Sequence, residues 1–290
     1  MSERPASAGP ALENRLPAEG INSSDEHPLR EFAWLIGAGL VTLAIVVLLV
    51  GWGARWLAPR LPFATEVKLA QRWIDKAPAP QHAARSAALQ TLAERIAASM
   101  ALPPGMAVVL SYEPGPIVNA YATLGGRIRV FDGLLRKLPS EDALAALLAH
   151  EIAHVKHRHV AANAGRGVAL ALLLGLVSAD TGAAAAQAVL GQVTNLALLG
   201  YSREQESEAD AAALAAVVAL YGHAGGMLEL FTSLGAAAPD EGPAIDMLRS
   251  HPLTAERIES IRARAAQAGW PLTGPRSALP PALGGGPPVP

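Results

Sequence analysis

A long uncharged segment near the N-terminus constrains the fold of this chain of 290 residues more than any other feature. Residues 32–54 contain no Asp, Glu, Lys or Arg, and as an α-helix they would extend about 34 Å, longer than a hydrocarbon core of roughly 30 Å. Trp34 lies near one end and Trp52 and Trp56 near the other, where aromatic side chains favour the membrane interface. We therefore predict a single transmembrane anchor. A buried core helix is the alternative, whereas a cleaved signal peptide fits poorly because the run starts late and lacks an A-x-A site.

The basic residues around this segment bear on its orientation. Two precede it closely and four follow it: Arg15 and Arg30, then Arg55, Arg60, Lys68 and Arg72. Because Lys and Arg favour the cytoplasmic side, the count leans toward a cytoplasmic C-terminal portion in a single-pass protein of the cell (inner) membrane.

The composition favours a mostly helical α+β fold. Apolar residues make up 51% of the chain and aromatic residues only 4%, so the apolar content is largely Ala and other small aliphatic types that favour helices. A net charge of −2 gives no sign of a nucleic-acid partner. The absence of cysteine excludes disulfides, thiol catalysis and Cys-ligated zinc.

Periodicity and turn residues divide the remainder of the chain. A helix is predicted at 82–101, short strands at 106–111, 117–123 and 127–131, and helices from Ser140 onward. The expected organisation is a flexible tail at 1–31, the anchor at 32–54, a linker at 55–80, one domain at 81–272 and a disordered Pro/Gly-rich tail at 273–290.

The helix that begins at Ser140 carries the most informative motif, His150-Glu151-Ile152-Ala153-His154. Histidines at positions i and i+4 lie on one helical face, so both imidazoles can bind one Zn²⁺. Glu151 is placed to accept a proton from a metal-bound water. The motif predicts a catalytic zinc site with one ion per chain.

A catalytic zinc needs a third protein ligand, and a later acidic segment supplies candidates. Glu206 and Asp210 are separated by four residues, so one can bind the metal while the other orients a ligating imidazole. We predict Glu206 as the ligand, with the neighbouring Glu204 and Glu208 solvated. His157 and His159 are expected to be exposed at a basic helix end, together with Lys156 and Arg158.

The sequence H-E-x-x-H followed by S-R-x-x-E-x-x-A-D resembles the zinc metallopeptidase family that includes HtpX and the CaaX prenyl protease, a gluzincin family. The hairpin from Asn119 to Val130, the Ser-Glu-Asp start of the active-site helix and the loop His251-Pro252-Leu253 are similar too. The resemblance covers residues 66–265. It implies a gluzincin-type domain with His150, His154 and Glu206 as ligands, Glu151 as general base and Asp210 as the residue that supports a ligand.

Two further site predictions concern the substrate. The strand at 118–123 or that at 127–131 offers an edge to which an extended peptide can add, with Asn119, Ala120 and Tyr121 as substrate-binding candidates. His251 is a candidate oxyanion donor, a fourth ligand that closes the resting site, or only a turn residue before proline.

The membrane layout departs from the multispanning members of that family. The later apolar segments, 168–177 and 183–199, are too short or too polar to span a bilayer and are expected to form a helical hairpin on the domain. The prediction is a membrane-anchored zinc metalloendopeptidase acting on unfolded or misassembled membrane and envelope proteins. The alternatives are a tethered chaperone with a structural or latent zinc site, and a zinc hydrolase of non-peptide substrates.

Overall fold

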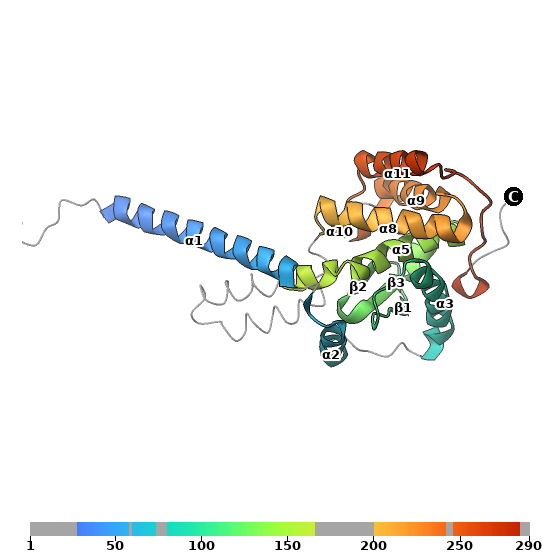
Figure 1. Ribbon diagram of the computed structural model, residues 1–290, viewed down its shortest axis with the longest axis horizontal. Helices are drawn as coiled ribbons and strands as arrows, with labels where there is room; N and C mark the ends of the chain where they lie inside the picture. Colours follow the sequence, from blue (N-terminus) through green and yellow to red (C-terminus); the bar gives the residue numbers. More distant parts are fainter. Residues whose placement is uncertain (1–27, 58–59, 74–79, 166–199, 242–245, 285–290) are drawn as a thin grey trace, which may run out of the picture. The chain divides into compact units, whose positions relative to one another are not determined.

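The computed structural model describes residues 28–57, 60–73, 80–165, 200–241 and 246–284 (Figure 1). The chain divides into two compact units, Met1–Ile45 and Val46–Pro290. The predicted apolar segments at 168–177 and 183–199 lie outside the described residues.

Helix α1, Pro28–Leu57, contains the long apolar segment. Residues Leu29–Gly53 are long and apolar enough to cross a membrane, judged by length and composition. The side chains of Trp34, Leu35 and Leu48 are each about 70% exposed, so this helix is not the buried core helix considered above. A helix that exposes such apolar side chains requires an apolar environment or a partner.

A small mixed sheet forms one part of the second unit. Its strands are β1 (Val109–Glu113), β2 (Ala120–Thr123) and β3 (Arg127–Phe131), in the order β1-β3-β2. β1 runs parallel to β3 and β2 runs antiparallel to it, so β2 lies at one edge. β1 and β2 each start three residues later than the strands predicted at 106–111 and 117–123.

Helices make up most of the other described residues of this unit, which confirms the mostly helical α+β class. They include α2 (Phe63–Trp73), α3 (Ala83–Ser99), α4 (Asp132–Leu135), α5 (Glu141–Lys156), α8 (Arg203–Tyr221), α9 (Gly225–Glu241), α10 (Asp246–Ser250) and α11 (Ala255–Ala268), with short 3₁₀ turns η2 (Pro80–His82), η3 (Leu124–Gly126) and η6 (Pro281–Leu283). α5 is the central element and contacts α3, α8, α9 and β2 (Figure 1).

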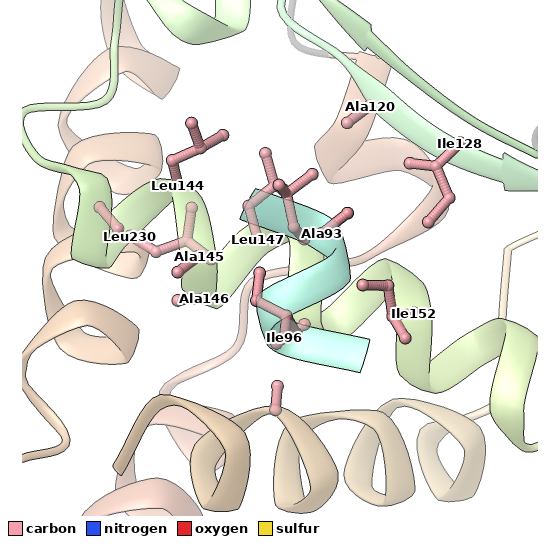
Figure 2. Packing of buried hydrophobic residues seen from close by; sticks show 14 of the residues in the cluster. Ala93, Ile96, Ala120, Ile128, Leu144, Ala145, Ala146, Leu147, Ile152 and Leu230 are labelled. Carbon is pink, nitrogen blue, oxygen red and sulfur yellow. The ribbon is translucent and has the colours of Figure 1, made fainter. Parts of the chain in front are cut away.

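The sequence of α5 explains its central position. Ser140 caps its N-terminus by accepting a hydrogen bond from the Ala143 amide, and Glu141 and Asp142 lie at the positive end of the helix dipole. Every residue from Asp142 to Val155 is buried. Ala145 and Ala146 leave room for neighbouring helices, while Leu144 and Leu147 fill the space toward them (Figure 2).

Helix α2 replaces much of the expected linker at 55–80. Its Glu66 carboxylate is buried and accepts hydrogen bonds from the Gly125 amide at 3.3 Å and from Arg158 Nε at 2.8 Å. Gly125 has a φ of +72°, and a Cβ there would meet Ala70 and Val67 of α2 at 3.0 Å. α2 is thus part of the second unit, because a buried carboxylate and a close backbone approach hold it in place.

The C-terminal segment also differs from expectation. Within residues 273–284 of the predicted disordered tail, Ser277 contacts the N-terminus of α5, although most of the segment is exposed. The Ser277 carbonyl accepts a hydrogen bond from the Glu141 amide at 2.9 Å, and the Ser277 amide donates to Asp142 Oδ1 at 3.0 Å. Leu283 is buried. The segment, rich in proline and glycine, has only the 3₁₀ turn η6 as regular structure, yet Ser277 and Leu283 contact the domain.

The buried ion pair of Glu66 and Arg158 gives a stability prediction. Glu66→Gln leaves the Arg158 guanidinium buried without its counter-charge and is expected to lower the free energy of unfolding by about 3 kcal/mol. Denaturant unfolding of the detergent-solubilised chain measures this. Glu94→Gln, on the exposed face of α3, is the matched control and should change little; an equal effect of both substitutions would contradict the prediction.

Candidate metal centre

The two histidines of α5 face one another across one helical turn. His150 Nε2 and His154 Nε2 are 3.1 Å apart, and the side chains are at most 3% exposed. Their positions follow from the four-residue spacing on a helix whose other faces are packed in the core. The predicted pair of imidazole ligands is therefore brought together.

Helix α8 brings Glu206 to the same point. The helix starts with a capping box in which Ser202 and Gln205 exchange side-chain and backbone hydrogen bonds. One turn later, Glu206 Oε1 lies 3.4 Å from His154 Nε2 and Oε2 lies 3.5 Å from His150 Nε2. The carboxylate is buried against both imidazoles, as predicted for the third ligand.

His251 adds a fourth donor from the segment after α10. Its Nδ1 lies 2.8 Å from Glu206 Oε1 and 3.1 Å from His150 Nε2. One donor atom from each of the four residues lies within 4.8 Å of all the others. His251 is thus part of the same buried cluster.

These donors fit a tetrahedral metal ion of the zinc type. Zn²⁺ binds imidazole nitrogen and carboxylate oxygen at about 2.0–2.2 Å, so neighbouring donors in a tetrahedron are about 3.4 Å apart. The contacts of 2.8–3.5 Å between the donors of this cluster bracket that value. A cation would also relieve the close approach of three imidazoles in a buried site.

Glu151 lies beside the cluster but is held by the sheet. Its Oε2 accepts a hydrogen bond from the Ala122 amide of β2 at 2.9 Å. Its Oε1 is buried, has no hydrogen-bond partner among the described residues and lies 3.6 Å from His251 Nε2. Burial raises the pKa of Glu151, an effect that the nearby His251 and His150 oppose. One oxygen is therefore fixed and the other is available to a proton.

Asp210 and Arg257 support the cluster from behind. Asp210 Oδ1 lies 3.0 Å from His150 Nδ1, and Arg257 forms an ion pair with it through Nη2 at 2.7 Å. Arg257 Nη1 lies 2.7 Å from Glu206 Oε2. Burial would raise the pKa of Asp210, but Arg257 and His150 lower it overall. The structure thus places Asp210 where the sequence predicted a partner of a ligating imidazole.

The electrostatics of the cluster favour ionised Glu206. Burial would raise the pKa of Glu206, but hydrogen bonds with the three imidazoles lower it strongly. Burial lowers the pKa of His154 well below its usual value. For His150 burial is outweighed by Asp210 and Glu206, which raise its pKa to about 10. An anionic carboxylate and a neutral His154 are the forms that a metal ion binds.

Two residues near His154 escaped the sequence analysis. Tyr201 stacks on its ring with centroids 3.7 Å apart and an angle of 19°. His159 was expected to be exposed, and this was wrong: it is buried, and its Nδ1 lies 2.9 Å from His154 Nδ1. Burial lowers the pKa of His159 to about 4. His157 is exposed, as expected.

Of two neighbours of His159, Arg158 differs from expectation, whereas Glu208 is exposed as expected. Arg158 was assigned to the exposed basic end but is buried against Glu66, as described above. Glu208 was expected to be solvated; its side chain is 58% exposed, yet Oε2 lies 3.0 Å from His159 Nε2. The H-x-x-x-x-H spacing from His154 to His159 was the available signal, but it is not a spacing within one helix, because α5 ends between the two residues.

The substrate-binding candidates lie on β2 or next to it. The Asn119 carbonyl accepts a hydrogen bond from the Phe131 amide, and Asn119 Oδ1 is buried without a partner among the described residues. The side chain of Ala120 points into the core (Figure 2). Tyr121 packs near Phe131 with ring centroids 6.1 Å apart. Their side chains do not join the histidine cluster; β2 reaches it through Ala122.

Comparison with known proteins agrees with this geometry. The model of Peptidase family M48 matches residues 83–265. The putative beta-barrel assembly-enhancing protease of Vibrio cholerae is 33% identical over 52% of this chain and 33% of its own length. The mitochondrial metalloendopeptidase OMA1 of Schizosaccharomyces pombe is 32% identical over 50% of this chain and 43% of its own. The metalloprotease YcaL of Escherichia coli is 32% identical over 51% and 59%.

A buried H-E-x-x-H helix with a carboxylate from a later helix defines a metallopeptidase domain. The chain belongs to peptidase family M48, which confirms the resemblance seen in its motifs. The matched segments span between a third and about three-fifths of these relatives, so the family assignment concerns the domain.

Proposed function

We propose that this protein is a membrane-anchored, zinc-dependent endopeptidase. The observation that carries the proposal is the buried cluster of His150, His154 and Glu206, with one unpaired oxygen of Glu151 beside it. These three residues would hold one zinc ion per chain. A site that served only to stabilise the fold would have no use for a buried carboxylate with an unpaired oxygen.

Zn²⁺, when bound, supplies a Lewis acid that acidifies water and polarises a peptide carbonyl. Glu151 Oε1 accepts the proton of the attacking water and later donates it to the nitrogen of the leaving amine. The hydrogen bond from the Ala122 amide keeps Oε2 in place, so that Oε1 remains directed at the reacting group. Asp210 and Arg257 orient His150 and Glu206 during this cycle.

The edge of β2 that faces away from β3 is the proposed substrate-binding element. Asn119 directs its backbone toward β3, so Ala120 and Ala122 direct their N–H and C=O groups to the opposite edge. The Ala122 amide reaches Glu151 on that side, which places the edge beside the proposed general base. An extended peptide that adds to this edge passes the site with its backbone aligned, whatever its side chains are.

The proposed substrates are unfolded or misassembled proteins of the membrane and envelope. Recognition through backbone hydrogen bonds suits unfolded segments, and α1 would keep the enzyme at the cell (inner) membrane. Relatives with names such as beta-barrel assembly-enhancing protease support this class. More Lys and Arg residues follow the apolar segment closely than precede it, which favours a cytoplasmic location of the catalytic unit.

Substitutions in the cluster test the proposal directly. Glu151→Gln removes the proton acceptor but no ligand, so we expect one zinc per chain and no cleavage of casein. His154→Ala removes a ligand and is expected to lose both zinc and cleavage. Metal analysis and casein digestion of the metal-replete, detergent-solubilised chain measure the two properties.

The other outcomes of this experiment separate the alternatives. Zinc in wild type and Glu151→Gln without cleavage by either would favour a tethered chaperone or a structural site. Normal cleavage by either variant would contradict the assigned roles. A metal-replete wild type without zinc would overturn the proposal as a whole.

His251 has a separate test. Because its Nδ1 lies within the cluster, we propose that it is a fourth donor in the resting site and must move before water can enter. His251→Ala is then expected to retain zinc less firmly and to cleave casein at least as fast as wild type. If His251 is instead the oxyanion donor, cleavage falls by about 10²- to 10³-fold while zinc is retained.

Strand addition predicts a periodic effect of backbone methylation in the substrate. In a cleaved peptide, N-methylation at a residue whose amide pairs with β2 should lower kcat/KM by about fivefold, since one hydrogen bond is lost. Methylation at the next residue should have little effect, because its amide points away. Peptides methylated at successive positions measure this, and equal tolerance at all of them would contradict strand addition.

A further inference from the structure

The buried His159 and the partly exposed Glu208 form a series of contacts that ends on His154, one of the two proposed imidazole ligands. His154 Nδ1 lies 2.9 Å from His159 Nδ1, and His159 Nε2 lies 3.0 Å from Glu208 Oε2. His159 is 5% exposed, so its ring nitrogens contact these side chains and not bulk water. The mechanism described above uses neither residue.

The proton positions along this chain follow from the geometry. His154 Nε2 faces His150 Nε2 and Glu206 Oε1, so a metal ion in the cluster requires its lone pair at that nitrogen. A neutral imidazole carries one N–H, which for His154 is then at Nδ1 and donates to His159 Nδ1. His159 in turn carries its proton at Nε2 and donates it to Glu208. Each donor meets an acceptor in only one tautomer of each ring.

We propose that His159 and Glu208 are positioning residues that fix the tautomer and orientation of His154 for metal binding. This inference rests on the proposed zinc function. It assigns to His154 the kind of support that His150 receives from Asp210 at 3.0 Å. Outer partners of this kind orient an imidazole ligand and increase its basicity toward the metal.

The turn after α5 makes this arrangement possible. α5 ends at Lys156, and Arg158 adopts a left-handed backbone with a φ of +61°. The reversal brings His159 back toward His154, which it could not reach within a continuous helix. Arg158 is held in this conformation by its buried ion pair with Glu66 of α2.

The inference can be tested by the rate at which a chelator extracts zinc from the full chain in detergent. His159→Leu removes the acceptor and is expected to raise the rate of zinc extraction by about 10- to 100-fold, because loss of such a partner weakens metal binding by about that factor. His159→Asn can keep an acceptor oxygen near the Nδ1 position and should recover part of this loss. Glu208→Ala should have a larger effect than Glu208→Gln, because the amide oxygen can still accept from His159.

Two controls separate positioning from folding. Glu259→Gln changes a carboxylate on α11 that is 75% exposed. This variant should lose zinc to the chelator at the wild-type rate. Thermal unfolding of the metal-free proteins shows whether His159→Leu impairs the fold itself; Glu208→Ala alters an exposed side chain and avoids that risk. In the Co²⁺-loaded proteins, the ligand-field absorption should change for His159→Leu and Glu208→Ala but not for Glu259→Gln.

The outcomes distinguish this inference from the proposed function. Zinc extraction from His159→Leu and Glu208→Ala at the wild-type rate would overturn the positioning role and leave the zinc site intact. A wild type that holds no zinc would instead overturn the proposed function, and the inference with it.

Discussion

The burial of helix α5 is the constraint on which the rest of the structure depends. The helix carries two imidazoles and a carboxylate into an apolar core. A polar group that lacks a hydrogen-bond partner there lowers the stability of the fold, because it has lost its hydrogen bonds with water. Each of these groups must therefore find a partner on a neighbouring element. Glu151 finds the Ala122 amide of β2, and His150 finds Asp210 of α8. The catalytic unit is arranged to give each of these groups a partner, while Glu151 Oε1 is without a hydrogen bond among the described residues.

Helix α8 supplies most of the partners of these buried groups. Glu206 enters the cluster, Asp210 holds His150, and Glu208 accepts from the residue that holds His154. Three carboxylates at alternate positions of one helix thus serve both imidazoles of α5. Arg257 balances part of their charge through ion pairs with Glu206 and Asp210. This explains how so many acidic groups can lie at a helix interface.

Helix α2 links the sequence that follows α1 to the helix α5, which carries the site. It begins at Phe63, a few residues after α1 ends at Leu57, and its Glu66 reaches both the β2–β3 turn and the residue after α5. The same carboxylate therefore helps to hold the edge strand and the turn that returns His159. Residues 63–73, which were expected to belong to a linker, are thus an integral part of the domain that holds the site.

Local sequence patterns were sufficient for the apolar helix, the mostly helical α+β class, the strand at 127–131 and the pair His150 and His154, because helical spacing and charge content depend on near neighbours. Glu206 was joined to that pair by the need of a catalytic zinc for a third ligand and by the resemblance of the two motifs. Local patterns were not sufficient for His159, for Arg158 or for the contacts of Ser277. Those residues have partners many positions away, on α8, α2 and α5. The burial of a polar or proline-rich segment is decided by what packs on it, and only the tertiary structure contains that information.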